Sequence, residues 1–473
     1  MKLSRIILLL IITISFSIST LAAQISEAKK DIIIKKSDVL IKKYLDLDIF
    51  SGVVLIADEG KPFYEKAFGF ANREKNIPNT INTKFDIGSM NKTFTKVVIY
   101  QLVDEGKLKF DDKLGKYLDG FPQEAVENIT IDQLLHHRSG YGDYHTPDFF
   151  DLPKSEKSIS RLVEKIKMLP LLFSPGTDQQ YSNSGFILLG AIIEKVTGKT
   201  YHENVRDRIV DPLQLTETYL ENKDQVPDRA IGYFKDAKGE IQDNEGFLEL
   251  PNPDGGFQST ASDILKFYQE YFYGNKFISA EAKKSIDEFN YYEQIKTTPG
   301  AIPQAGGFEG ANTVIYEILR DKISIIVFAN MDEPVAEQLG LGILNIIRDK
   351  EPESPTLPAI QNVYKALNEN GVQYVNDNFN ELTINFHPTD PKDIILNQVG
   401  YTFLFDNQVD KAIAAFQLNV ELFPNIANCY DSLGEALLAE GDKEGALKNY
   451  KIALELNPDL PSAQEAIKKL TTK

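Results

Sequence analysis

Ser89 and Lys92 are the first pair of side chains in this sequence whose types and spacing could do chemistry. They follow the strand-like segment 84–88 and open an apolar helical run. Residues three apart lie side by side on a helix, so the lysine amine could take the proton of the serine hydroxyl. A serine activated by a lysine is a known form of nucleophile. The spacing predicts a nucleophile at Ser89, although it also fits a helix-start serine followed by a solvated lysine.

Tyr181 and Asn183 form a second polar pair, between a Pro-Gly turn at 173–177 and the apolar helical run 186–193. A loop fixed by proline and glycine can hold a phenol and a carboxamide toward one spot. The alternatives are a core tyrosine and an asparagine that only caps the following helix. We expect both side chains to face the serine.

A glycine-rich segment at 304–310 comes just before the strand-like run 313–319. Small residues such as Gly306 and Gly307 let a substrate lie close to the edge of a strand. Backbone N–H groups there could stabilise the negative charge that develops on a carbonyl oxygen. This segment is therefore the predicted substrate-binding and oxyanion region.

Taken in order, these three motifs resemble the S-x-x-K, Y-x-N and K/H-x-G signatures of the serine β-lactamase and penicillin-binding-protein superfamily. The similarity points to the branch that holds class C β-lactamases, D-Ala-D-Ala carboxypeptidases and related esterases. It extends over about residues 35–350, where segments 51–56, 131–140 and 253–260 also look like that branch. The resemblance implies an antiparallel sheet flanked by helices, with an inserted helical region.

The resemblance also implies acyl transfer through a covalent serine ester. Ser89 would attack a carbonyl, Lys92 and Tyr181 would share the proton transfers, and a water would hydrolyse the acyl-enzyme. Asn183 would orient the Lys92 amine and the substrate amide. The oxyanion would lie between the backbone N–H groups of Ser89 and Gly307. No metal or organic cofactor is implied.

The third motif departs from the family because Gln304 stands where the family has Lys or His. A cation there helps to hold a substrate carboxylate and favours the anionic tyrosine, which a neutral carboxamide cannot do. We therefore expect uncharged ester or amide substrates, with weak or no action on β-lactams. A catalytically weak protein that binds cell-wall fragments is an alternative. A D-Ala-D-Ala carboxypeptidase or D-aminopeptidase is another, with Arg138 as a replacement cation.

The N-terminal segment 1–23 has the order of a secretory signal peptide, with Lys2 and Arg5 before the apolar run 6–18 and small residues after it. We expect a protein exported to the periplasm or outside a bacterium, with no membrane span after removal of the signal. An uncleaved anchor is the alternative. The 473 residues carry a net charge of −18, which disfavours nucleic acid and anionic lipid as partners. A small-molecule or peptidoglycan-type acyl substrate is expected instead.

Cysteine and histidine usage excludes other enzyme classes. The single cysteine, Cys429, cannot form an intrachain disulfide and fits a buried thiol. None of the five histidines lies in a Gly-x-Ser-x-Gly or His-Glu-x-x-His context, which disfavours α/β-hydrolases and zinc proteases. His136 and His137 look structural, whereas His145 could border the cleft.

Periodicity predicts an α/β (α+β) hydrolase domain at 24–350, in which early and late strands enclose a helical middle. The expected helices are 37–47, 93–105, 185–196 and 335–348, and the expected strands are 52–57, 62–70, 313–319 and 322–329.

A proline-rich linker and bridging segment at 351–393 precedes an internal repeat at 394–473. Glycine, alanine, aromatic and proline positions recur 34 residues apart, for example Gly400 with Gly434. This period resembles tetratricopeptide repeats. Two repeats are few for an independent solenoid, so their apolar faces need cover from a C-terminal cap helix, from segment 360–386, from the hydrolase domain or from a partner. The repeats are expected to dock a protein or peptide, or to brace the hydrolase domain.

Overall fold

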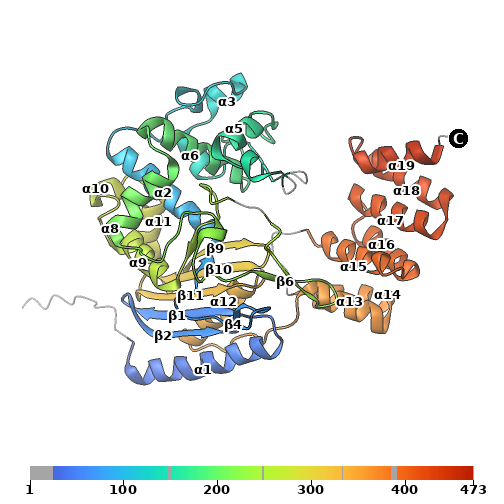
Figure 1. Ribbon diagram of the computed structural model, residues 1–473, viewed down its shortest axis with the longest axis horizontal. Helices are drawn as coiled ribbons and strands as arrows, with labels where there is room; N and C mark the ends of the chain where they lie inside the picture. The colour runs from blue at the N-terminus through green and yellow to red at the C-terminus, as the bar shows by residue number, and fades with distance from the viewer. Residues whose placement is uncertain are drawn as a thin grey trace, which may run out of the picture.

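The computed structural model describes residues 25–145, 149, 152–247, 250–332, 334–384 and 391–471. The predicted signal segment 1–23 lies outside the described residues. The centre of the N-terminal part is an antiparallel five-stranded sheet with the order β2-β1-β11-β10-β9 (Figure 1). Its strands are β1 (Gly52–Asp58), β2 (Lys61–Phe68), β9 (Ile302–Phe308), β10 (Ala311–Ile318) and β11 (Ile323–Ala329).

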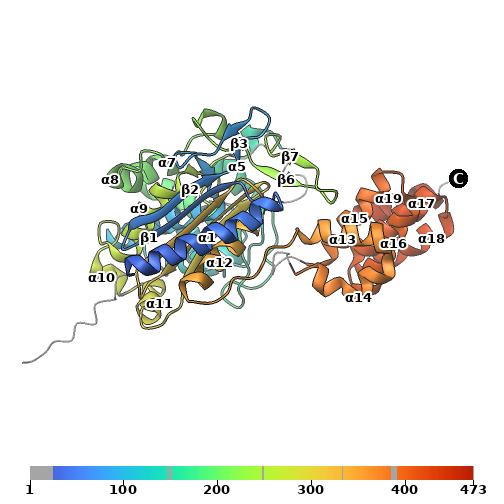
Figure 2. The same cartoon turned by 90° about the horizontal axis from the view of Figure 1, so that it is seen from below.

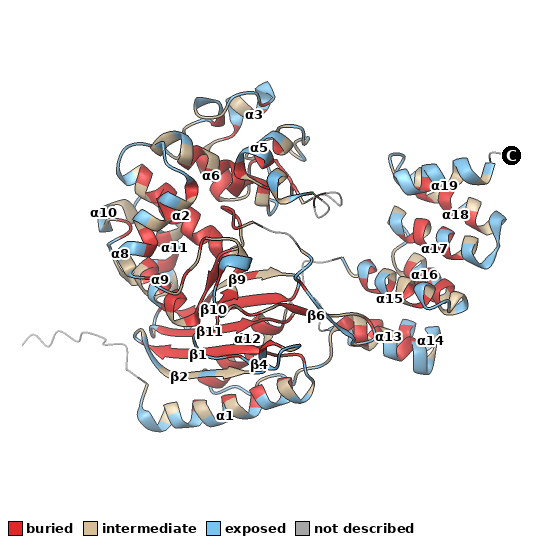
Figure 3. Cartoon of the chain, in the orientation of Figure 1, coloured by how far each residue is buried: buried red, intermediate tan, exposed pale blue. Residues whose placement is uncertain are grey.

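The sheet forms because its central strands are apolar on both faces. Every residue of β1 and β11 is buried, and the strands are red throughout in Figure 3. One face packs against α1 (Glu27–Asp46) and α12 (Val335–Ile347), which Figure 2 shows crossing the sheet. The other face packs against the inserted helices, including α2 (Asn91–Asp104) and α9 (Ala261–Tyr273). The expected α+β class is therefore correct, and α1 begins ten residues before the predicted helix start.

The inserted region between β2 and β9 is mostly helical and lies over one edge of the sheet (Figure 1). Its remaining helices are α3 (Gln123–Asn128), α4 (Ile131–Leu135), α5 (Ile159–Lys167), α6 (Asn183–Thr197), α7 (Tyr201–Val205), a π-helical turn (Arg206–Val210), α8 (Asp211–Leu213), α10 (Ala280–Lys283) and α11 (Asp287–Ile295). Short strand pairs join it to the sheet: β3 (Phe70–Asn72) with β4 (Ile77–Pro78), β5 (Phe85–Asp86) with β8 (Gln258–Ser259), and β6 (Tyr233–Lys235) with β7 (Ile241–Asp243).

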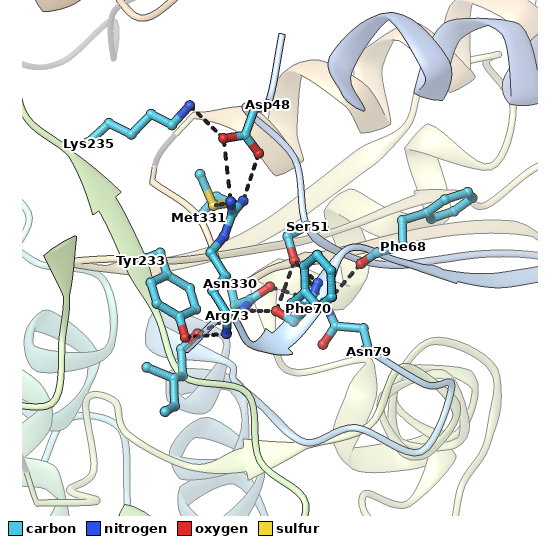
Figure 4. Close-up of polar contacts among 11 residues, drawn as sticks. Asp48, Ser51, Phe68, Phe70, Arg73, Asn79, Tyr233, Lys235, Asn330 and Met331 are labelled. Atoms are coloured by element: carbon cyan, nitrogen blue, oxygen red, sulfur yellow. Dashed lines mark hydrogen bonds and ion pairs between the residues drawn. The ribbon is translucent and has the colours of Figure 1, made fainter. Parts of the chain in front are cut away.

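A buried polar cluster fixes the loop that leaves β2 (Figure 4). Asn79 Nδ2 donates to Ser51 Oγ at 3.0 Å and to the Phe68 carbonyl at 2.9 Å. Asn330 Nδ2, just after β11, donates to the carbonyls of Phe70 at 2.9 Å and Ile231 at 2.7 Å. Satisfied buried polar groups of this kind specify one backbone arrangement. The cluster therefore sets the path of the chain toward Ser89.

Glu317 makes the stability of the sheet dependent on pH. It is fully buried in β10 and accepts hydrogen bonds from Tyr273 Oη and Ser324 Oγ, both at 2.6 Å. Burial raises the pKa of Glu317 from 4.5 to about 7. The folded state therefore binds this proton more tightly, and its stabilisation is lost as the pH rises from 4.5 toward about 7.

We expect Glu317→Gln to remove this pH dependence. Relative to the variant, the wild type should lose on the order of 3 kcal/mol of unfolding free energy between about pH 5 and about pH 8. Urea unfolding of both proteins across that interval measures the difference. Parallel stability curves would show that Glu317 does not titrate with a raised pKa.

The C-terminal part consists of antiparallel helices that stand beside the sheet domain (Figure 1). Helices α15, α17 and α19 begin 34 residues apart, as do α16 and α18. The repeated glycines lie where the helices are closest, because a Cβ on Gly400 would come within 2.5 Å of the Phe416 ring and one on Gly434 within 2.9 Å of the Tyr450 ring. The helix bounds are α15 (Asp393–Phe405), α16 (Val409–Leu422), α17 (Ala427–Glu440), α18 (Lys443–Leu456) and α19 (Pro461–Thr471).

The segment predicted as linker and bridge contains two further helices, α13 (Ala359–Asn370) and α14 (Val372–Leu382). They share a core with α15 and α16, while α19 covers α18 at the other end. The β6–β7 hairpin also contacts this module, because Ala237 joins the same core and Lys238 Nζ lies 2.6 Å from Asp406 Oδ2. In the described ranges, no helix combines the length and apolar character that crossing a membrane requires.

Candidate active site

Ser89 lies in a 3₁₀ turn, Gly88–Met90, that leads directly into α2. The sequence predicts one continuous helical turn, whereas the structure changes helix type between the serine and the lysine. Gly88 has a φ of 48°, and a Cβ on it would lie 2.5 Å from the Gly307 nitrogen. A glycine is required there by both the backbone conformation and the packing. The turn therefore holds the serine close to strand β9.

Lys92 and Tyr181 both reach the Ser89 hydroxyl. Lys92 Nζ lies 2.9 Å from Ser89 Oγ, and Tyr181 Oη lies 2.7 Å from the same oxygen. Lys92 is only 6% exposed, and its Nζ also donates to the Asp254 carbonyl at 2.7 Å. The lysine is thus held in place inside the protein, whereas Tyr181 has 52% of its surface exposed. Either group could accept the serine proton when it is in its basic form.

His137 positions Tyr181, a role that the sequence analysis missed. Its ring stacks on the tyrosine ring with centroids 4.6 Å apart, and its Nδ1 accepts the Ser182 backbone N–H at 3.1 Å. Burial and the charge of Lys92 lower the pKa of His137 to about 4, so the ring is neutral at neutral pH. A histidine beside another histidine gives no sequence signal for this role, because the contact arises only in the tertiary structure.

Asn183 is the first residue of α6, and the cap of that helix is Ser182, whose Oγ accepts the Gly185 N–H at 3.2 Å. The capping alternative for Asn183 is therefore wrong. Its Nδ2 lies 2.7 Å from Asp143 Oδ2 and 3.3 Å from His145 Nδ1. Burial acts to raise the pKa of Asp143, but hydrogen bonds from His145 and Asn183 hold it below its usual range. In the described part of the chain, Asn183 thus contacts this pair rather than Lys92.

The third motif lies in the edge strand β9, which pairs with the following strand β10. A Cβ on Gly306 would lie 2.1 Å from the Ile87 carbonyl oxygen and 2.6 Å from the Ser89 nitrogen. Gln304 and Gly306 are two residues apart, so their Cα–Cβ directions share the face of β9 that meets the serine turn. Gly307 follows and lines the same cleft as Ser89.

The cleft in front of Ser89 is open to solvent, and its volume is roughly 470 Å³ when that open solvent is included. His145 borders it, as the sequence suggests. Arg138 does not appear among the described residues that line it, and its Nη2 donates to the Gly176 carbonyl at 2.6 Å. The described lining residues are Asp86, Gly88, Ser89, Tyr144, His145, Asn183, Leu250, Asp254, Gly255, Gly256, Gly307 and Phe308.

Comparisons with known proteins identify related chains. The family model described as Beta-lactamase matches residues 38–340. Penicillin-binding protein 4* of Bacillus subtilis is 30% identical over 314 residues, 60% of this chain and 69% of the relative. Teichoic acid D-alanine hydrolase of Staphylococcus aureus is 30% identical over 301 residues, 61% of this chain and 72% of the relative.

A solved structure of a related protein has a similar fold. The penicillin binding protein from Bacillus halodurans superposes with a TM-score of 0.54 at 27% identity, covering 64% of this chain and 98% of that one. The family match, the relatives and the serine, lysine and tyrosine at one oxygen share one explanation: this chain belongs to the beta-lactamase family and is a serine hydrolase.

Proposed function

We propose that the chain is an exported bacterial hydrolase that cleaves ester or amide substrates through an acyl-enzyme on Ser89. The observation that carries the proposal is the pair of hydrogen bonds at Ser89 Oγ, from Lys92 Nζ and Tyr181 Oη. An inactive binding protein has no need for a buried lysine and a phenol aimed at one hydroxyl. The export is supported by the order of residues 1–23 and by a relative whose name states teichoic acid as its substrate.

In the proposed reaction, Ser89 Oγ attacks the substrate carbonyl while its proton passes to Lys92 or Tyr181. The N–H groups of Ser89 and Gly307 stabilise the oxyanion, and the proton is returned to the leaving group. Water then attacks the ester on Ser89, and the same two side chains move its proton. Asn183, held by Asp143 and His145, presents its carboxamide to the substrate from the cleft wall.

The relatives favour a second, narrower candidate: an esterase or amidase for D-alanyl groups. One relative is a teichoic acid D-alanine hydrolase, whose name states a D-alanyl substrate. Asp143 supplies a carboxylate next to Asn183, where the free ammonium of an aminoacyl group could bind. A D-alanyl aryl ester hydrolysed much faster than its L-alanyl isomer would support this candidate.

The proposal is tested by the intact mass of residues 24–473 after mixing with a short aryl ester and, separately, with a penicillin. We expect a mass increase or turnover with the ester, and neither in Ser89→Ala, which keeps the fold but lacks the nucleophile. Acylation by penicillin would support a cell-wall peptidase instead. The absence of any adduct and of turnover would favour the weak, fragment-binding alternative.

Gln304 offers a separate test of substrate charge. We expect Gln304→His to increase acylation by a carboxylate-bearing substrate such as penicillin by about tenfold, because a cation near the cleft favours that group. The rate with an uncharged aryl ester serves as the internal reference, and Gln304→Asn, which stays neutral, is the matched control. An unchanged ratio of the two rates in Gln304→His would contradict the role assigned to this position.

The function of the C-terminal helices is a separate proposal. Lys238 and Ala237 of the β6–β7 hairpin contact the module, which supports a role in bracing the hydrolase domain. Docking of a protein or peptide on the helical repeats is the second candidate. Deletion of residues 357–473 should lower the melting temperature of the hydrolase domain if the module is a brace.

A further inference from the structure

A second compartment opens beside the catalytic cleft, on the side of β5 and β8. Its volume is roughly 530 Å³ when the open solvent within it is included. Asp86, Leu250, Gly256 and Phe308 line both the compartment and the cleft, so the two spaces meet at a shared wall. A substrate bound at Ser89 could therefore extend into it.

Two positively charged side chains line this compartment. Among the described lining residues the charged ones are Asp86, Lys223 and Arg229. The side chains of Lys223 and Arg229 are only 18% and 15% exposed. Charges that are partly removed from water interact more strongly with a ligand than charges on the open surface.

These two cations share one carboxylate. Glu245 lies 3.7 Å from Lys223 Nζ and 2.6 Å from Arg229 Nη2. The other described hydrogen bonds of these two side chains are to backbone carbonyls. Lys223 donates to the Asn244 carbonyl, and Arg229 donates to the Ala230 carbonyl. An ammonium has three donors and a guanidinium five, so donors remain for a ligand. Burial lowers the pKa of Lys223, which shows that its charge is poorly solvated.

Among the described residues that line the compartment, Asp86 is the one carboxylate, and it is already engaged. Its carboxyl accepts hydrogen bonds from the Gly88 N–H at 2.8 Å and from Gln258 Nε2 at 3.0 Å. Burial raises the pKa of Asp86, while the charges of Lys223 and Arg229 act in the opposite direction. Asp86 thus fixes the turn before Ser89 and links the cationic compartment to the nucleophile.

We propose that this compartment is a subsite for an anionic group, a phosphate or a carboxylate, on the ester substrate whose carbonyl reacts at Ser89. The subsite rests on the proposed hydrolase function and adds a substrate class to it. Gln304 is not among the described residues that line the compartment, so the neutral third motif and the cationic compartment would select different parts of the substrate. In such a substrate the part next to the scissile bond is uncharged, and the anionic group lies further away.

The test compares matched esters that differ only in charge. One pair is acetylglycerol and acetylglycerol phosphate, and the other is an aryl butyrate and the corresponding aryl hemisuccinate. We expect the wild type to prefer one anionic ester over its uncharged partner by about tenfold or more in kcat/KM, less so at high salt. The pair that shows the preference identifies phosphate or carboxylate as the recognised group.

Lys223→Met and Arg229→Met should each lower this preference by about tenfold. Lys238→Met, which removes a cation that pairs with Asp406 outside the compartment, is the matched control and should keep it. Equal rates within both substrate pairs, or a preference that survives both compartment variants, would overturn the subsite.

A further measurement on the wild type keeps the proposal testable if the variants do not fold. Inorganic phosphate or succinate should competitively inhibit wild-type hydrolysis of the anionic ester that the enzyme prefers, and a lack of inhibition by both anions would count against the subsite. The two proposals fail in different ways: no hydrolysis of any ester, charged or uncharged, refutes the acyl-enzyme function, whereas hydrolysis without charge preference refutes only the anionic subsite.

Discussion

Lys92→Met should reduce the rate of acylation at Ser89 by about a hundredfold to ten-thousandfold, the usual contribution of a positioned general base. The reason is geometric: Lys92 Nζ lies 2.9 Å from Ser89 Oγ and is fixed by the Asp254 carbonyl. Methionine keeps the apolar stem of the side chain and removes the amine. Stopped-flow acylation by an aryl ester, with the adduct confirmed by intact mass, measures the effect.

Lys92→Arg is the informative control for this change. Arginine keeps the positive charge but cannot act as a base in a protein. If proton transfer through Lys92 drives acylation, both variants lose activity to a similar degree. If the lysine contributes only its charge, Lys92→Arg keeps most of the rate, and proton transfer must then be assigned to Tyr181, whose Oη lies 2.7 Å from the serine oxygen.

Gly306→Ala is the second change for which we expect a large effect. The added methyl group would lie 2.1 Å from the Ile87 oxygen and 2.6 Å from the Ser89 nitrogen, and both are backbone atoms that cannot turn aside. Either β9 or the serine turn must move, and the oxyanion donors on both would separate. We expect kcat to fall by about a hundredfold or more. The unfolding free energy should fall by about 1–3 kcal/mol.

Ala305→Val tests whether the loss of kcat is specific to the face of β9 that meets the serine turn, or follows from enlarging any residue of the strand. Ala305 is exposed and points to the opposite face of β9 from Gly306. Its enlargement should leave kcat and the urea midpoint close to those of the wild type. A Gly306→Ala protein with normal kcat would show that β9 can move away from Ser89 without loss of the oxyanion site.

Tertiary contacts explain which local predictions succeeded. The apolar runs of β1 and β11 are buried on both faces, so the pattern of residues predicted strands close to their observed bounds. The 3₁₀ turn at Ser89 was harder to predict from the sequence. Gly88 takes a left-handed conformation there and packs against Gly307, which is distant in the chain. The glycine-rich segment 304–310 was described only as preceding the strand-like run 313–319, whereas pairing with β10 makes most of it part of the edge strand β9.

Residues close together in the chain were enough to predict the Ser89/Lys92 motif, the order of the three motifs, the α+β class and the helical repeats. The meeting of distant groups depends on how the elements pack. Packing brings Asn183 to Asp143 and His145 and places the His137 ring on Tyr181. It also brings Lys223 and Arg229, more than 130 residues after Ser89, to a compartment that adjoins the nucleophile. Such contacts depend on how separate elements pack, and local sequence patterns carry no record of that packing.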